Sequence, residues 1–169
     1  DADYIYRVFV EEDSAHFTTP GHEEIELALV KLYHATGNEK YLKLSAFFID
    51  QRGANEKDRQ QDGRPVGIYQ QDHLPCAEQT TAVGHSVRAC YLYSGMADIA
   101  RERGDEALKA ACQKIFDNMT NRRMYVTAGL GSTHIGEAFT QDYDLPNETA
   151  YTETCASISL GYFAQRMLL

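Results

Sequence analysis

Apolar residues recur at intervals of three and four along most of this chain, a spacing that places them on one face of a helix. The first such run extends from His22 to Thr36 and ends at Gly37. Asn38 is a good N-cap for a second run, which ends at Gly53. Because the connection between the two runs is so short, the pattern predicts an antiparallel helical hairpin.

The same arrangement returns in the second half of the chain. A third helix is predicted from about Glu78 to Arg103, where Gly104 closes it, and Asp105 caps a fourth helix. A fifth helix, from Glu153 to Leu169, opens a third unit. The sequence therefore predicts an all-α protein made of repeated antiparallel hairpins.

Three segments depart from this pattern. Residues 1–19 look extended, and residues 54–75 form a polar loop that suits a lid or rim. Residues 124–155 begin with a short β-prone run, Met124 to Thr127, and continue with glycines and acids but no lysine or arginine. Long irregular segments are usually functional or disordered, and the aromatic residues here argue against disorder. We therefore interpret residues 124–155 as a glycine-rich active-site segment.

Repeated hairpins either stack into an open solenoid or close into a toroid of inner and outer helices. In a toroid, the starts of the inner helices gather at one end. His22 and His85 each follow a glycine at matching points of the repeat, and Glu153 begins the fifth helix. We therefore expect these three residues to line one mouth.

Composition narrows the choice of function. The chain has 169 residues, 43% of them hydrophobic, which is enough for one domain with a core. A net charge of -9 argues against nucleic-acid binding, and no apolar run is long enough to cross a bilayer. Four cysteines without a CxxC pair favour a reducing compartment. We expect a cytoplasmic protein, or a periplasmic one if a signal peptide precedes this sequence.

The candidate chemistry rests on a few side chains, each of which also has a common structural role. Glu137 follows a glycine in the irregular segment and can act as a proton donor, although a single loop acid is more often a solvated group. Glu153 and Cys155 are both zinc-ligand types at a helix start, and further ligands must come from elsewhere. His22 and His85 can hydrogen-bond a sugar hydroxyl or ligate a metal, although a lone histidine is more often structural.

Three stretches of the sequence resemble the bacterial β-L-arabinofuranosidase family, glycoside hydrolase family 127. They are GHEEIELALVKLYHATGNEKYL, EQTTAVGHSVRACYLYSGMADIA and MYVTAGLGSTHIGEAFTQDYDLPNETAYTETCAS, in that order along the chain. The resemblance extends from about Pro20 to Leu169, and the third stretch is the most specific.

The resemblance implies an (α/α)6-barrel catalytic domain with β-sandwich domains attached, and a carbohydrate substrate. It also implies a retaining mechanism in which a zinc-bound cysteine thiolate is the nucleophile and a glutamate is the acid/base. Carried over by motif, Glu137 in GEAF would be the acid/base, and Glu153 and Cys155 in ETC would be zinc ligands. His22 and His85, each in a Gly-His pair, would contact the sugar.

Two departures from the family pattern qualify this expectation. The family's nucleophilic cysteine and its neighbouring cysteine ligand lie downstream of ETC, and this chain contains neither. We therefore expect residues 1–169 to be a fragment of one barrel domain, without the flanking barrel helices and β-sandwich domains, inactive by itself and weak in zinc binding. The stretch GHEEIELAL also differs from that of characterised arabinofuranosidases, so the sugar can be a related one.

Two other functions stay open at this point. One is an (α/α)-barrel glycosidase without a metal, in which Glu137 pairs with Asp142 or Asp144. The other is a non-enzymatic helical-repeat module that binds a partner, which leaves the segment of glycines and acids unexplained.

Overall fold

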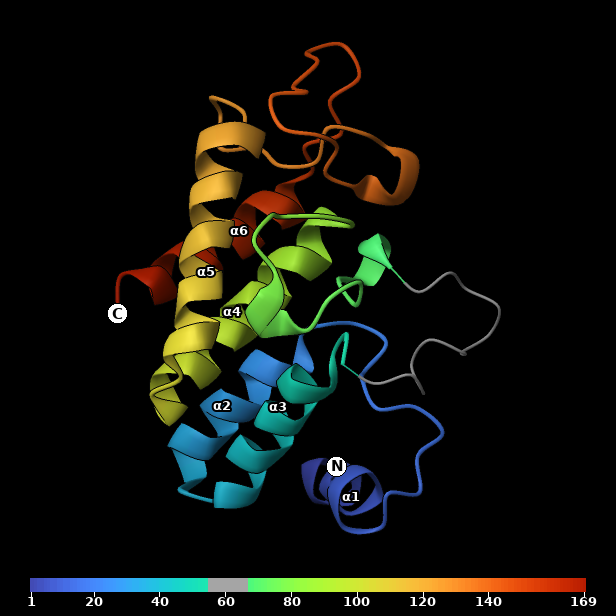
Figure 1. The fold of residues 1–169 in the computed structure, drawn as a ribbon, viewed down its shortest axis with the longest axis vertical. Coiled ribbons are helices and arrows are strands. Elements are labelled where there is room, and N and C mark those ends of the chain that lie inside the picture. The colour runs from blue at the N-terminus through green and yellow to red at the C-terminus, as the bar shows by residue number, and fades with distance from the viewer. Residues whose placement is uncertain (55–66) are drawn as a thin grey trace.

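The computed structural model describes residues 1–54 and 67–169 (Figure 1). Most of the predicted lid, residues 55–66, lies outside the described residues. The two predicted hairpins are present: α2 (Ile25–Thr36) with α3 (Glu39–Gln51), and α4 (Ser86–Arg103) with α5 (Glu106–Asn118). The chain ends with α6 (Thr154–Met167), as predicted. The shorter elements are α1 (Ala2–Tyr6), π turns at Arg7–Glu11 and Met119–Arg123, and 3-10 turns at Ile68–Gln70, Cys76–Glu78 and Ile135–Glu137.

The glycines and N-cap residues predicted from the sequence do set the ends of these helices. Gly37 and Gly104 adopt left-handed backbone angles, with φ of +68° and +62°, and so stop α2 and α4. The Asn38 side chain accepts a hydrogen bond from the Lys40 amide at the start of α3. Asp105 does the same for α5, by accepting from the Leu108 amide. Short capped connections therefore hold each helix pair antiparallel.

Helix α4 is the centre of the fold, in contact with α2, α3, α5 and α6 (Figure 1). Its side chains Tyr93, Met96 and Ile99 are fully buried, and Tyr93 packs against Phe163 of α6. Gly95 brings α4 close to α2, because an added Cβ there would lie 2.8 Å from the Cβ of Glu26. A helix buried all round in this way is typical of the inner layer of a helical toroid.

The N-terminal prediction is wrong: residues 1–19 are not extended, because α1 and the following π turn occupy residues 2–11. Ile5 and Phe9 pack with the buried side chains of α2 and α3, and the rings of Phe9 and Phe48 are 5.2 Å apart. The apolar residues of this short stretch gain burial by coiling onto α3, which local pattern alone did not reveal.

The third helix also starts later than predicted. Residues 76–78 form a separate 3-10 turn, and α4 begins only at Ser86. Gly84 has a φ of +72°, and an added Cβ would collide with the carbonyl oxygen of Ile68. This close approach breaks the helical path and directs the chain into α4 at His85. Likewise α2 begins at Ile25, which is later than the predicted start at His22.

The predicted β-prone run forms a tight turn and not a strand. Met124 pairs with Leu130 in an isolated bridge, and the Tyr125 amide donates to the Gly129 carbonyl at 3.0 Å. The described residues contain no extended sheet to which this run could add.

A buried ion-pair network fixes the entry to α2. Arg52, at the end of α3, contacts Glu23 at 3.0 Å and Glu26 at 3.4 Å, and all three side chains are almost completely buried. Arg88 of α4 also approaches Glu23, at 3.4 Å. Burial raises the pKa of Glu23 to about 7, although both arginines oppose this shift. The network holds the residues around His22 against α3 and α4.

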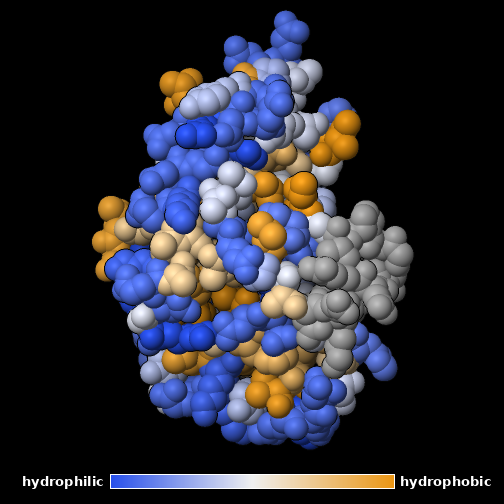
Figure 2. Space-filling model, viewed as in Figure 1, coloured by the Kyte–Doolittle hydropathy of each residue, from blue (hydrophilic) through white to orange (hydrophobic). Residues whose placement is uncertain are grey.

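The surface in Figure 2 is mostly hydrophilic on the face shown, with separate hydrophobic patches. Among the described helices, none has the length and apolar character needed to span a membrane.

Candidate active site

Glu137 projects from a loop that is tied to the start of α4. Gly136 and Glu137 both have positive φ, +69° and +50°, and a non-glycine residue in this region is strained. Ser86 Oγ donates to the Glu137 carbonyl at 3.0 Å, and the Phe139 amide donates to the Gly84 carbonyl at 2.9 Å. The strain is therefore held by bonds to the residues that begin α4.

Within residues 1–54 and 67–169, each oxygen of the Glu137 carboxylate has a hydrogen-bonding partner. His85 Nε2 lies 3.0 Å from Oε2, and the Tyr151 hydroxyl donates to Oε1, also at 3.0 Å. The Glu137 side chain keeps 40% of its exposure, so solvent or a substrate can reach it. A reachable carboxyl with two hydrogen-bonding neighbours can give and take a proton.

His85 is fixed in place by its own surroundings. It is the N-cap of α4, and its Nδ1 accepts a hydrogen bond from the Arg88 amide at 3.4 Å. We therefore assign the ring proton to Nε2, which makes His85 a donor to Glu137. The Tyr69 ring packs edge-to-face against His85 with centroids 5.6 Å apart, and Arg88 covers Tyr69.

His22 lies just before α2, with its ring edge-to-face on Tyr91 of α4 at 6.1 Å. Burial lowers the pKa of His22, and the positive charge of Arg88 lowers it further. Both effects favour the neutral form of the ring. Its Nδ1 is buried and has no hydrogen-bond partner among the described residues. A neutral imidazole has one donor nitrogen and one acceptor nitrogen, so it is chemically suited to contact with a hydroxyl group.

Glu153 and Cys155 stand at the start of α6. Glu153 is the N-cap, but its side chain makes no capping hydrogen bond, and Cys155 is exposed. The other three cysteines are buried, and burial raises the pKa of each thiol to about 12. Cys155 is thus the accessible thiol in the described part of the chain. Both side chains are chemically suited to zinc. No cluster of three or more metal-ligating side chains occurs within residues 1–54 and 67–169, so these two alone do not complete a site.

Asp142 has a different role from the one considered for it. Its carboxylate contacts Arg123 at 2.8 Å and Arg122 at 3.0 Å, and it accepts from Asn118 at 3.0 Å. The hydrogen bond from Arg122 contributes most to lowering the pKa of Asp142 to about 2, and the one from Asn118 contributes next. A carboxylate clamped in this way is structural, which argues against Asp142 as the second carboxylate of a catalytic pair.

The contacts bring several predicted residues together and add others. His85 and Glu137 touch directly, and Tyr151 links Glu137 to the residues that lead into α6. Tyr151, Ser86 and Arg88 were not predicted. Ser86 and Arg88 follow the Gly-His pair, and Tyr151 lies two residues before Glu153, so proximity to the named residues was the available signal.

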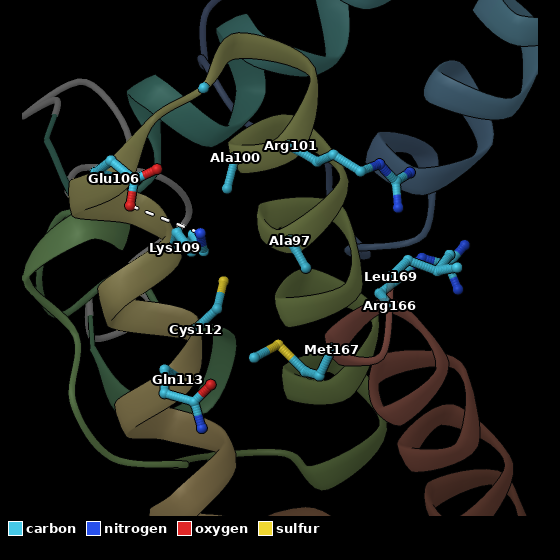
Figure 3. Close-up of a pocket in the computed structure, with 11 residues that line it drawn as sticks. Ala97, Ala100, Arg101, Glu106, Lys109, Cys112, Gln113, Arg166, Met167 and Leu169 are labelled. Carbon is cyan, nitrogen blue, oxygen red and sulfur yellow. Dashed lines mark ion pairs between the residues drawn. The ribbon is translucent and has the colours of Figure 1, made fainter.

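A pocket elsewhere in the molecule does not include these residues. It lies between α4, α5 and the end of α6, and Figure 3 shows Cys112 and Met167 on its walls. Ala97, Ala100 and Arg101 line it from the last turns of α4, whereas His85 precedes the first turn.

Comparison with known proteins gives consistent matches over the whole chain. A family model described as the catalytic domain of the GH127 β-L-arabinofuranosidases matches residues 1–169. A non-reducing end β-L-arabinofuranosidase of Bifidobacterium longum is 43% identical over 180 residues, which cover 99% of this chain and 27% of that protein.

Two solved structures are also similar. A GH127 β-L-arabinofuranosidase from Geobacillus stearothermophilus T6 has a TM-score of 0.89 and 52% identity, covering 99% of this chain and 28% of that one. A structure described as a GH127 β-arabinofuranosidase has a TM-score of 0.89 and 45% identity, with 99% and 25% covered. The chain thus spans about a quarter of the length of the relatives that it matches.

Proposed function

This chain belongs to glycoside hydrolase family 127, and from that premise we propose that it is the central part of the catalytic domain of a retaining glycosidase. The substrate class is L-arabinofuranosides or closely related sugars, because the relatives are described as β-L-arabinofuranosidases. Glu137 acts as the acid/base, and His22 and His85 bind the sugar.

The observation that carries this proposal is the arrangement of Glu137. Its carboxylate is reachable, is held by one donor on each oxygen, and sits in a strained loop anchored to α4. A proton donor must be oriented within hydrogen-bond reach of the leaving oxygen, and fixed partners supply that orientation. A solvated surface acid would have neither the strain nor the two partners.

Zinc enters the proposal through Glu153 and Cys155, which would supply two of its ligands. When bound, zinc makes a thiolate available as a nucleophile at neutral pH. The remaining ligands and the nucleophile would come from the rest of the parent protein. We therefore expect the 169-residue chain alone to be inactive and to bind zinc weakly.

The direct test replaces Glu137 by Gln in the parent protein. Hydrolysis of methyl β-L-arabinofuranoside, whose poor leaving group needs protonation, should lose about 10²-fold or more in kcat, because a positioned general acid/base contributes about 10²–10⁴-fold. The matched control is Glu148→Gln, an exposed acid of the same segment, which should keep full activity. Equal activity of wild type and the Glu137 variant would refute the proposed role.

The zinc part has its own test. Elemental analysis of the reduced parent protein should give about one zinc per chain, and Cys155→Ser should lose most of it. Ser157→Ala, in the same helix turn, should keep the metal. Zinc retained in full by Cys155→Ser would remove Cys155 from the ligand set. A reduced parent protein that held no zinc would instead favour the metal-free glycosidase with a carboxylate pair.

A further inference from the structure

The two partners of Glu137 differ in what they can do. Both lie 3.0 Å from a carboxylate oxygen, so distance alone does not distinguish them. One is an imidazole N–H and the other is a hydroxyl. A hydroxyl can donate or accept a hydrogen bond, whereas a ring nitrogen that carries hydrogen can only donate.

His85 cannot reverse its role. Its Nδ1 is occupied by the Arg88 amide, so a proton cannot move to Nδ1 without breaking the cap of α4. The ring is held by Tyr69, and its side chain is only 11% exposed. Oε2 of Glu137 therefore faces a donor at every stage of a reaction, which makes it the acceptor oxygen.

Tyr151 can reverse its role because its hydroxyl rotates freely about the ring bond. Its main chain is anchored, since the amides of Tyr151 and Thr152 both donate to the Gly131 carbonyl. The hydroxyl proton can therefore turn toward or away from Oε1, which lies 3.0 Å from the Tyr151 oxygen.

We propose that Tyr151 is a positioning residue for Glu137, and that the proton transferred in catalysis is carried on Oε1, the oxygen beside Tyr151. The inference deepens the proposed function and rests on it. In the protonated acid, the Oε1–H bond points to the glycosidic oxygen and the Tyr151 hydroxyl turns away. The Oε2 oxygen stays bonded to His85.

The proton that leaves Oε1 in the first step of the reaction returns to it in the second. When the bond from the anomeric carbon to the glycosidic oxygen breaks, its electron pair goes to that oxygen, which takes the proton from Oε1. The anomeric carbon bonds to the thiolate supplied by the rest of the parent protein. Tyr151 then donates to the new carboxylate. In the second step, water attacks the anomeric carbon, its proton returns to Oε1, and the thiolate leaves with the bonding pair.

The test compares substrates that need the acid to different degrees. Methyl β-L-arabinofuranoside has a poor leaving group and needs protonation, whereas the 4-nitrophenyl glycoside does not. In the parent protein, Tyr151→Phe should lower kcat/KM about tenfold for the methyl glycoside, since a hydrogen bond to a charged group is lost. The loss for the nitrophenyl glycoside should be under about threefold.

Tyr125→Phe is the matched control. Tyr125 belongs to the same segment, and its hydroxyl donates to the Pro146 carbonyl at 3.1 Å, away from Glu137. The control should change both substrates by the same factor. Zinc content should equal that of the wild type in both variants.

The outcomes separate the two proposals. An equal loss on both substrates for Tyr151→Phe, or a loss of zinc from it, would overturn the positioning role while Glu137→Gln still showed its leaving-group-dependent defect. If Glu137→Gln itself showed no defect on either substrate, the proposed function would fail, and the role of Tyr151 with it.

Discussion

Glu137 and Asp142 are close together in one irregular segment, yet their surroundings are opposite. Glu137 is bonded to a histidine and a tyrosine, and keeps 40% of its side-chain exposure. Asp142 is bonded to two arginines and an asparagine, with 28% exposure. Residue type and sequence context are nearly the same for both, so the difference lies in their partners.

The comparison shows how partners decide the role of a carboxylate. Two full positive charges stabilise only the ionised form of Asp142, which therefore holds the segment to α5 and the turn that follows it. Uncharged donors orient Glu137 without fixing its charge, so it can exchange a proton. The first arrangement gives stability, and the second allows chemistry.

The largest expected effect on stability comes from replacing Arg123, the more buried of the two arginines that contact Asp142. Arg123 is 12% exposed and also donates to the carbonyls of Ala82 and Thr140. Arg123→Met removes the donor to the carbonyls of Ala82 and Thr140 and one of the two arginines that bind Asp142, and should cost about 3 kcal/mol of unfolding free energy. Urea unfolding of the parent protein measures it. Arg122→Met, at an exposed position, is the control and should change little.

A smaller effect is expected from Asp142→Asn. At pH 7 the variant should lose about 1–2 kcal/mol of unfolding free energy, since the partly exposed pairs are screened by solvent. The pKa of Asp142 is lowered to about 2 in the folded protein. Its stabilisation is therefore fully present above the unfolded value of about 4, and is lost as pH falls toward 2.

Unfolding curves at several pH values can check that the stabilisation by Asp142 is lost on acidification. The difference between wild type and Asp142→Asn should be constant from neutral pH to about pH 4 and shrink below it. A difference that grew on acidification would mean that Asp142 is not held in its ionised form, and the contrast with Glu137 would disappear.

The smallest effect is expected at His22, which in the proposal contacts a hydroxyl of the sugar. Loss of one neutral hydrogen bond from His22→Ala should lower kcat/KM of the parent about three- to tenfold. The melting temperature should fall only slightly, because the His22 ring is partly buried against Tyr91 and its Nδ1 has no hydrogen-bond partner among the described residues. A large fall in melting temperature with unchanged kinetics would make His22 a structural residue.

Local sequence signals predicted much of the fold. Asn38 and Asp105 cap their helices, Gly37 and Gly104 stop them, and the predicted hairpins match a family whose solved members have the (α/α)6-barrel fold. These features depend on residues next to each other in the chain. The coiling of residues 2–11 was missed, because it depends on apolar contact with α3.

The candidate site was predictable only in part. The repeated Gly-His pair and the motif GEAF pointed to His85 and Glu137, which are in contact. The ion pairs of Asp142 with Arg122 and Arg123 were not predicted, although both arginines immediately precede the segment. Tyr151 was also missed, because which oxygen a side chain meets depends on how distant segments are folded together.

The measurement that tests the central claim most directly compares Glu137→Gln and Asp142→Asn in the parent protein. Both kcat on methyl β-L-arabinofuranoside and the melting temperature would be measured for each. We predict that Glu137→Gln loses about 10²-fold or more in kcat at an unchanged melting temperature. Asp142→Asn should melt lower and keep kcat within about threefold. The opposite pattern, with activity lost from Asp142→Asn and kept by Glu137→Gln, would contradict the account.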